Sequence, residues 1–276
     1  MAEKKPADTV TQTYTMGYSE EFQKLLRRRS AEISAAHLLP HLEPGLRVLD
    51  FGCGPGTISM GLAKAVEPGE LHGIDMEGSQ IEIAQTAASA GRHDNTVFLK
   101  GDIASLPYQD DYFDVAHCHA VLMHVPDTQA VLTEVQRVLK PGGRISSREM
   151  IGASSFLEPE PEDLGNAWEA FRKLIQLNGG HPEMGKELKR ALVEAGFQDI
   201  EASASFELYS TAEDIEFYHA FASDWFFSTQ TVAALTKGSL ASQEQVERWH
   251  TLLDQWKDEP GACAAIGWGE AMGRKP

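Results

Sequence analysis

The stretch 48–57, VLDFGCGPGT, decides the fold. It begins as an apolar run and then breaks into three glycines at alternate positions, Gly52, Gly54 and Gly56. A helical pattern over 57–66 follows directly. Glycine lets the backbone approach a bound molecule closely, and the first turn of a helix directs free N–H groups toward it. A strand, a glycine turn and a helix in this order predict a ligand-binding loop in an open α/β sheet.

The spacing of the loop narrows the choice of ligand. A phosphate-binding P-loop requires a lysine after its last glycine, and none follows here. A dinucleotide loop has the spacing GxGxxG, whereas this chain has Thr57 where the third glycine belongs. Asp50 immediately precedes the loop, where its carboxylate would repel a pyrophosphate and attract an amine. The pattern therefore predicts a nucleoside ligand that has a cationic end and no phosphates.

Strand and helix patterns alternate on both sides of this loop, which favours parallel βαβ units. The chain then changes to a long alternating strand over 197–210 and a final one over 263–275. We expect a Rossmann-like, doubly wound α/β fold with a seven-stranded, mostly parallel sheet and an antiparallel last strand. An N-terminal helical lid and a C-terminal helical insert complete the expected fold. The expected strands before the change are 46–51, 70–75, 96–100, 112–119 and 144–150, and the expected helices between them are 57–66, 78–90 and 128–139.

The expected organisation is one α/β domain behind a short tail. Aromatic residues concentrate in the late helical stretch, which favours an apolar pocket or a packed core there. The expected divisions are a disordered tail over 1–12, a domain over 13–276, a lid helix over 13–42, a core over 43–150, and a C-terminal half over 151–276 with a second, helical lid over 211–257 that would cover the molecule acted on.

Composition excludes several classes of partner. The formal net charge of −17 opposes binding to nucleic acid or to anionic membranes. The three cysteines are widely separated, so no metal site and no disulfide framework is expected. The polar start predicts no secretory signal, and no apolar run is long enough to span a membrane. We expect a cytoplasmic protein that acts on a small molecule as a monomer or homodimer.

Further polar positions follow the next strands. Asp75 ends the second strand, where a carboxylate can accept both ribose hydroxyls, and Met76 beside it can cover an adenine. Asp102 follows the third strand and can accept a hydrogen bond from an adenine amino group. These side chains are expected along one edge of the sheet.

At this point the chain resembles a known family. The motifs VLDFGCGPG, GID, GDIASLPY, FDVAHCHAVLMHVPD and RVLKPGG occur in the order typical of class I S-adenosylmethionine-dependent methyltransferases. The resemblance covers about residues 30–150 and extends to the branch that includes ubiquinone and menaquinone biosynthesis enzymes. It implies S-adenosylmethionine as cofactor, S-adenosylhomocysteine as product, and transfer to an O, N, C or S atom of a small molecule. If the aromatic stretch 217–227 lines a pocket, the expected acceptor is an apolar or aromatic metabolite.

The resemblance also implies roles for individual residues. Gly52 and Gly54 would face the methionine part of the cofactor, with Asp50 near its amine. Asp75 would bind the ribose. The remaining implied contacts are Met76, Asp102 and Ile103 at the adenine, Cys118 and His119 at the methionyl end, and Tyr14 and Arg29 at the carboxylate.

A general base is required only if the acceptor must lose a proton. His119 is the preferred candidate because the fourth strand opens toward the transferring methyl, although a histidine that only supports a loop is equally consistent. Glu149 ends the fifth strand and is a candidate contact for the acceptor. For His124 a structural role is favoured.

Two other functions remain open from the sequence. Asp75 would also suit a nicotinamide cofactor, which leaves an NAD-dependent oxidoreductase as an alternative. A non-catalytic protein that retains the fold and binds the cofactor is the other alternative.

Overall fold

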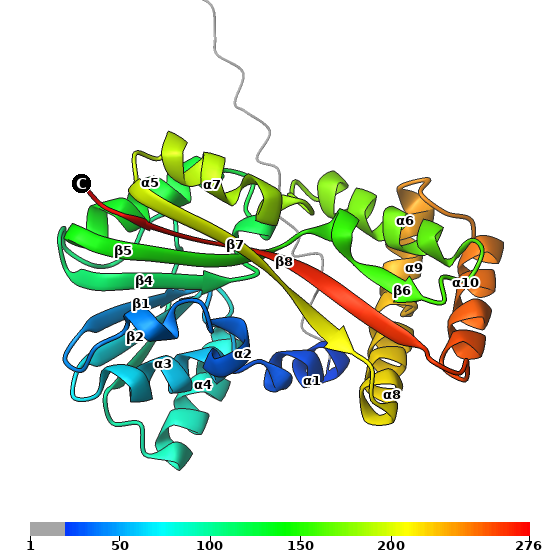
Figure 1. Cartoon of the computed structure of the whole chain (residues 1–276), viewed down its shortest axis with the longest axis horizontal. Helices are drawn as coiled ribbons and strands as arrows, with labels where there is room; N and C mark the ends of the chain where they lie inside the picture. Colours follow the sequence, from blue (N-terminus) through cyan, green and yellow to red (C-terminus); the bar gives the residue numbers. More distant parts are fainter. Residues whose placement is uncertain (1–19) are drawn as a thin grey trace, which may run out of the picture.

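The computed structural model describes residues 20–276 and shows one large mixed sheet with helices on both faces (Figure 1). The predicted tail over 1–12 lies outside the described residues. The strands are β1 (Arg47–Phe51), β2 (Glu70–Asp75), β3 (Thr96–Lys100), β4 (Phe113–His119), β5 (Leu139–Met150), β6 (Phe156–Glu158), β7 (Gln198–Tyr209) and β8 (Cys263–Arg274).

The strand order confirms the predicted doubly wound sheet. The strands lie side by side in the order β3-β2-β1-β4-β5-β8-β6, and β7 pairs with β8. The first five strands are mutually parallel, and β8 is antiparallel to both β5 and β7. The predicted antiparallel last strand is therefore correct. After β3 the chain returns to the other side of β1 and forms β4, which places the glycine loop at the switch point of the sheet, where ligands bind in such folds.

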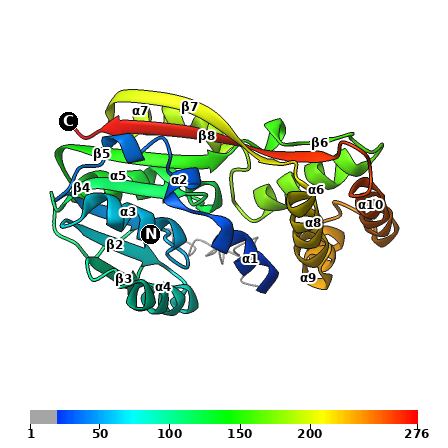
Figure 2. The ribbon, with the colours of Figure 1, turned by 60° about the horizontal axis from the view of Figure 1, so that its bottom comes forward.

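The strand count differs from the expected seven, because the sheet has eight strands. The additional strand is β6, a three-residue segment that pairs with the first part of β8. No alternation could reveal a strand this short. Its consequence is that β8, with β6 and β7 beside it, extends the sheet beyond the end of β5 toward the late helices (Figures 1 and 2).

Helices cover the two faces unequally. On one face α2, α3 and α4 pack over β1, β2 and β3, and on the other α5 and α7 pack over β5 and β8. The remaining helices form a lobe beyond the sheet, in which α6 packs against α9 and α10 (Figure 1). The α-helices are α1 (Glu20–Arg28), α2 (Ala31–Ser34), α3 (Thr57–Val66), α4 (Gly78–Gly91), α5 (Thr128–Val138), α6 (Leu164–Leu177), α7 (Met184–Glu194), α8 (Ala212–Phe221), α9 (Thr229–Lys237) and α10 (Gln243–Trp256).

Short helical turns complete the described chain. They are the 3-10 turns η1 (Leu39–His41), η2 (Leu122–His124) and η3 (Gly152–Ser154), and the π-helical turn η4 (Ala222–Phe226) that continues α8.

The expected lid helix over 13–42 is not one helix in its described part. It is divided into α1 and α2, because Ser30 is extended (φ −143°, ψ 165°) and starts a new helix. Continuous apolar spacing could not show this break, since serine is compatible with both a helix interior and a helix cap. As a result, α1 leaves the sheet and contacts α8 of the late lobe (Figure 2).

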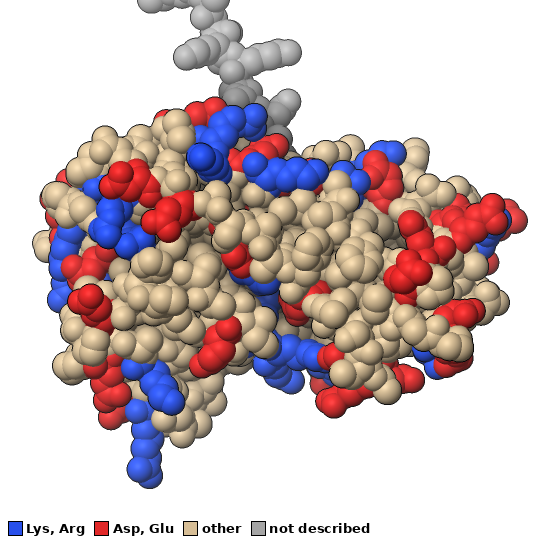
Figure 3. Space-filling view, in the orientation of Figure 1, with Lys and Arg blue, Asp and Glu red and all other residues tan. Residues whose placement is uncertain are grey.

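The surface is mixed in charge on the face seen in Figure 3. Acidic and basic side chains are intermixed there, with acidic ones gathered at the helical end of the molecule (Figure 3). Within residues 20–276, no helix is both long enough and apolar enough to cross a membrane.

Candidate functional site

The glycine loop runs from the end of β1 to the start of α3. Gly52 has a left-handed backbone (φ +76°), and a Cβ built on it would clash with Cγ2 of Val121. Gly54 is also left-handed (φ +52°), yet a Cβ there would meet no atom of the described residues within 4 Å. The loop is therefore closely packed against the segment after β4 on one side and open on the other.

Gly52→Ala should destabilise the protein by about 3 kcal/mol, from left-handed strain and the clash with Val121. Gly142→Ala is the matched control, because Gly142 has the same φ of +76° with nothing near its Cβ position. Urea unfolding of both variants separates the two contributions. If both variants lost the same free energy of unfolding, the clash with Val121 would contribute nothing to the cost of Gly52→Ala.

Asp75, at the end of β2, connects the loop to the next βα turn. Its Oδ2 accepts the backbone N–H of Gly54 at 2.9 Å, and its Oδ1 accepts that of Glu77 at 2.9 Å. Burial is the main cause that raises the pKa of this carboxyl, and the two backbone donors oppose the rise. The carboxylate predicted for the ribose is thus also the group that fixes the shape of the glycine loop.

Asp50 lies behind the loop rather than in its open side. The side chain is buried, and its Oδ2 accepts the hydroxyl of Ser59 in α3 at 2.5 Å. Burial raises the pKa of Asp50 to about 7. The predicted proximity to the cofactor amine remains a prediction, and the contact visible here joins β1 to α3.

The raised pKa of Asp50 predicts a pH dependence of stability. Because the pKa of about 7 in the folded protein exceeds the ordinary aspartate pKa of 3.8, the wild type loses stability as the pH rises through this window. Asp50→Asn retains the acceptor for Ser59 and removes the titration, so its stability relative to wild type should increase between pH 4 and 7, by at most about 4 kcal/mol. Urea unfolding of both proteins at several pH values tests this, and parallel profiles would contradict it.

The expected adenine side lies at the ends of β2 and β3. Met76 is exposed, and the Asp102 carboxylate accepts the N–H of Ala104 at 2.8 Å, which leaves it on an exposed turn. Ile103 packs against the main core. The structure therefore brings these predicted residues to one edge, as expected from the parallel strands.

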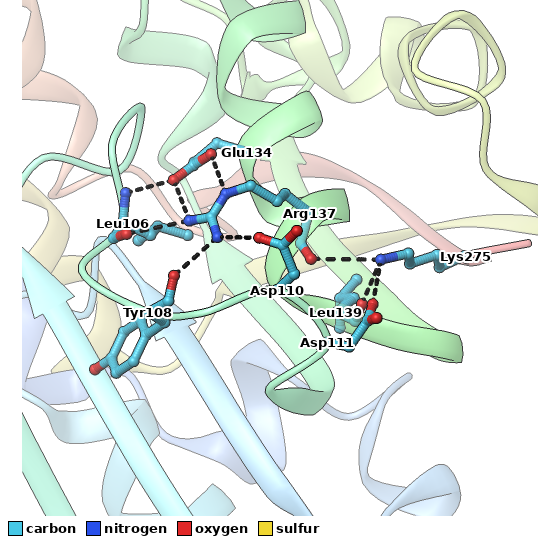
Figure 4. A network of polar contacts seen from close by, with 8 residues as sticks. All are labelled: Leu106, Tyr108, Asp110, Asp111, Glu134, Arg137, Leu139 and Lys275. Atoms are coloured by element: carbon cyan, nitrogen blue, oxygen red, sulfur yellow. Dashed lines mark hydrogen bonds and ion pairs between the residues drawn. The ribbon is translucent and has the colours of Figure 1, made fainter.

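A polar network fixes the loop that follows Asp102 (Figure 4). Arg137, near the end of α5, binds the carboxylates of Asp110 and Glu134 at 2.7 Å and the carbonyl of Tyr108 at 2.8 Å. Glu134 also accepts the N–H of Leu106 at 2.7 Å. The loop is thus attached to α5, which holds the edge carrying Asp102 in place.

Cys118 and His119 end β4 and point to opposite faces. Cys118 has no exposed surface, and its Sγ donates a hydrogen bond to the hydroxyl of Ser147 at 3.2 Å. This side chain therefore does not fit the predicted contact with the cofactor. Only the backbone of Cys118 remains for such a contact. His119 packs against Trp268 with ring centroids 4.6 Å apart. Burial, aided by the charge of Arg29, holds the pKa of His119 well below its usual value, so the ring is neutral.

Glu149 does not occupy the position expected for an acceptor contact. It has no exposed surface, and its Oε1 accepts the N–H groups of Val121 and Leu122 at 3.0 and 2.9 Å. Its Oε2 accepts the N–H of Met123 at 3.0 Å. A carboxylate engaged in this way supports the backbone of η2 and is inaccessible to an acceptor.

Of the two residues expected at the cofactor carboxylate, Tyr14 lies outside the described residues. Arg29, directly after α1, is half-buried and lines a cavity beside the β4 end. His124 lines the same cavity, and burial lowers its pKa to about 3. Arg29 thus lies in the wall of this cavity, and its contact with the cofactor carboxylate stays a prediction.

This cavity lies between the sheet and the late lobe and has a volume of about 120 Å³. Ala120 and Met150 from the strand ends form one wall, and the late helices form the opposite wall. Several aromatic residues of the predicted acceptor lid belong to its lining, namely Tyr218, Phe221, Trp225, Phe226 and Phe227.

Sequence reasoning missed some of the lining. Trp168 and Phe171 come from α6, Trp268 from β8, and Glu207 from β7. Along β7, Ser205 and Glu207 lie on one face and Phe206 on the other. This alternation could have predicted which face of the strand carries Glu207. Nothing in the sequence showed that the face adjoins a cavity.

Comparisons with known proteins agree on one family. A model of the methyltransferase domain matches residues 42–196. An uncharacterized methyltransferase of Schizosaccharomyces pombe is 30% identical over 217 residues, which are 76% of this chain and 77% of the relative. A demethylmenaquinone methyltransferase of Bacillus pumilus is 30% identical over 176 residues, 59% of this chain and 75% of the relative.

Among solved structures, the YcgJ protein of Bacillus subtilis has a TM-score of 0.62 at 20% identity, covering 88% of this chain and 98% of that one. It shows the same fold. The family match overturns the alternative of an NAD-dependent oxidoreductase, whose cofactor requires a different loop. The chain belongs to the class I methyltransferases, enzymes that use S-adenosylmethionine as methyl donor.

Proposed function

We propose that this methyltransferase modifies a small, apolar or aromatic molecule that binds in the cavity between the sheet and the late helices. The observation that carries the proposal is the lining of the cavity, which is almost entirely apolar and includes three tryptophans, Trp168, Trp225 and Trp268. Pockets of this kind bind ligands through apolar contact, with a few polar groups setting orientation.

The loop at the switch point fits S-adenosylmethionine. The open space at Gly54 leaves room for a ligand against the backbone, and the carboxylate of Asp75 stands beside it at the strand end. We propose that Gly52, Gly54, Asp75, Met76 and Asp102 hold the cofactor, as the sequence predicted. When bound there, it supplies a methyl group on a cationic sulfur, which is an activated electrophile.

The residues beside the cavity favour catalysis by positioning. His119 and His124 are both held neutral with lowered pKa values, so neither is matched to strong base catalysis near neutral pH. The apolar walls exclude water from the transfer path, and the helices of the late lobe orient the acceptor. We therefore propose that His119 supports the site and acts at most as a weak base.

We propose further that the protein belongs to the branch of the family that includes the ubiquinone and menaquinone biosynthesis enzymes. The demethylmenaquinone methyltransferase among the relatives supports a place near the quinone-biosynthesis enzymes. An apolar, aromatic-lined cavity is compatible with acceptors that contain a planar ring. The methylated atom, O, N, C or S, is left to experiment.

The test uses methyl-tritiated S-adenosylmethionine with aromatic acceptors that carry hydroxyl, amine or thiol groups. We expect label in the solvent-extractable fraction for at least one acceptor. Ala222→Phe, which adds a ring to the cavity wall, should reduce transfer at least tenfold and leave S-adenosylhomocysteine affinity within twofold. Ala233→Phe, at an exposed position in α9, is the matched control. Binding of the cofactor product without transfer to any acceptor would contradict the proposal.

A further inference from the structure

The strand β7 presents two different faces. Phe206 and Leu208 are exposed on the outer side, whereas Ser205 and Glu207 alternate with them and face inward. In the sheet, Glu207 lies opposite Ile266 and Ser205 lies opposite Trp268. Ile266, Trp268 and Glu207 all line the cavity. The edge of the sheet thus brings one carboxylate to an apolar wall.

The carboxylate of Glu207 is held in a defined orientation. Its Oε1 accepts the hydroxyl of Tyr209 at 2.7 Å, and Tyr209 is itself buried. The second oxygen, Oε2, has no hydrogen-bond partner within the described chain. An oriented carboxylate with one oxygen occupied and one available is suited to accept a hydrogen bond from a ligand.

Neighbouring charges indicate which kind of donor fits. Arg28 pairs with Asp214 at 2.6 Å. Arg148 pairs with Glu270 at 3.3 Å and is also attracted by the charge of Glu207, so this carboxylate already lies in the field of one buried cation. Among residues 20–276, the charged side chains that line the cavity are those of Arg29 and Glu207, whose charges offset each other, and His124 is neutral. A cationic ligand would upset this balance, whereas a neutral ligand preserves it.

We propose that Glu207 determines the specificity of the cavity by accepting a hydrogen bond from a hydroxyl group on an otherwise apolar acceptor. The inference rests on the proposed function, since it describes the ligand of the same cavity. The hydroxyl donates to Oε2 of Glu207, and the apolar body of the acceptor packs among the aromatic side chains. A ligand that lacks the donor leaves a partly desolvated carboxylate without a partner, which disfavours its binding.

The probes are three molecules of nearly equal shape, 2-naphthalenemethanol, 2-ethylnaphthalene and 2-naphthylmethylamine, which present a hydroxyl, a methyl and an ammonium group. Quenching of tryptophan fluorescence reports their binding, because Trp168, Trp225 and Trp268 line the cavity. In the presence of S-adenosylhomocysteine, the alcohol should bind the wild type at least tenfold more tightly than either of the other two.

Variants assign the difference to Glu207. Glu207→Leu should bring the alcohol and the hydrocarbon within twofold of each other, and the milder Glu207→Gln should reduce the difference at least threefold. Glu201→Gln, on the same strand and outside the cavity, should bind all three probes as the wild type does. Equal binding of alcohol and hydrocarbon by the wild type, tighter binding of the amine, or no binding of any probe would each overturn the assignment.

Calorimetry with S-adenosylhomocysteine separates this inference from the proposed function. If the product binds and label is transferred, but the probes show no dependence on Glu207, only the inference fails. If no acceptor is methylated while the alcohol still binds through Glu207, the proposed function fails and the cavity remains a binding site for hydroxylated apolar molecules.

Discussion

Asp75→Ala is expected to weaken S-adenosylhomocysteine binding about 100-fold, which corresponds to about 2.7 kcal/mol. Two effects combine in this value. The variant removes the proposed acceptor for the ribose hydroxyls, and it leaves the N–H groups of Gly54 and Glu77 without the carboxylate that binds them at 2.9 Å. Loss of a charged hydrogen-bond acceptor costs about 1.5–3 kcal/mol in comparable sites.

Isothermal titration calorimetry of wild type and variant with S-adenosylhomocysteine measures this loss. Asp94→Ala removes an exposed acid from the loop before β3 and serves as the control, with an expected change below twofold. Asp75→Asn should lie between wild type and Asp75→Ala, because the amide retains one acceptor oxygen. An Asp75→Ala protein that binds as tightly as the wild type would show that the carboxylate is not part of the cofactor site.

Glu149→Ala is expected to lower the free energy of unfolding by about 4 kcal/mol, in the range for disruption of a buried hydrogen-bond network. Glu149 has no exposed surface, and its loss leaves three consecutive backbone N–H groups of the η2 region without acceptors. Cofactor binding should also weaken, because Val121 in this region packs against Gly52 of the glycine loop.

Urea unfolding followed by circular dichroism tests the effect. Ser147→Ala removes one minor donor to Glu149, at 3.3 Å, and should cost only about 1 kcal/mol. Glu149→Gln should fall between the two variants, since its amide oxygen replaces one of the two acceptors. A loss of less than 1 kcal/mol for Glu149→Ala would mean that the η2 backbone does not depend on this carboxylate.

Much of the fold could be predicted from the sequence because strong local signals agreed with one another. The strand β2 and the helix α3 occupy the predicted residues, and α4 and α5 end within one residue of the prediction. Their boundaries coincide with glycines, caps and turns that act over a few residues. The strand β6 was missed because it depends on pairing with the distant β8, and the break at Ser30 was missed because serine suits both a helix interior and a helix cap.

The candidate site was predictable only in part. Residues at the ends of β1, β2 and β3 must meet at one edge of a parallel sheet, so the positions of Asp75 and Asp102 follow from topology. The role of Glu149 depends on the backbone of a loop that is 26–28 residues away. Glu207 depends on the register between β7 and β8. Neither the contact of Glu149 with a distant backbone nor the register that places Glu207 produces a recognisable pattern in a single sequence.

The central claim is that the glycine loop and the aromatic cavity form one continuous site for methyl transfer. A crystal structure with bound S-adenosylhomocysteine tests it most directly. The claim predicts that the product lies along Gly52, Gly54 and Asp75 and that its sulfur faces the cavity, toward Ala120 and Met150. A sulfur that faces bulk solvent, or is separated from the cavity by a layer of side chains, would contradict it.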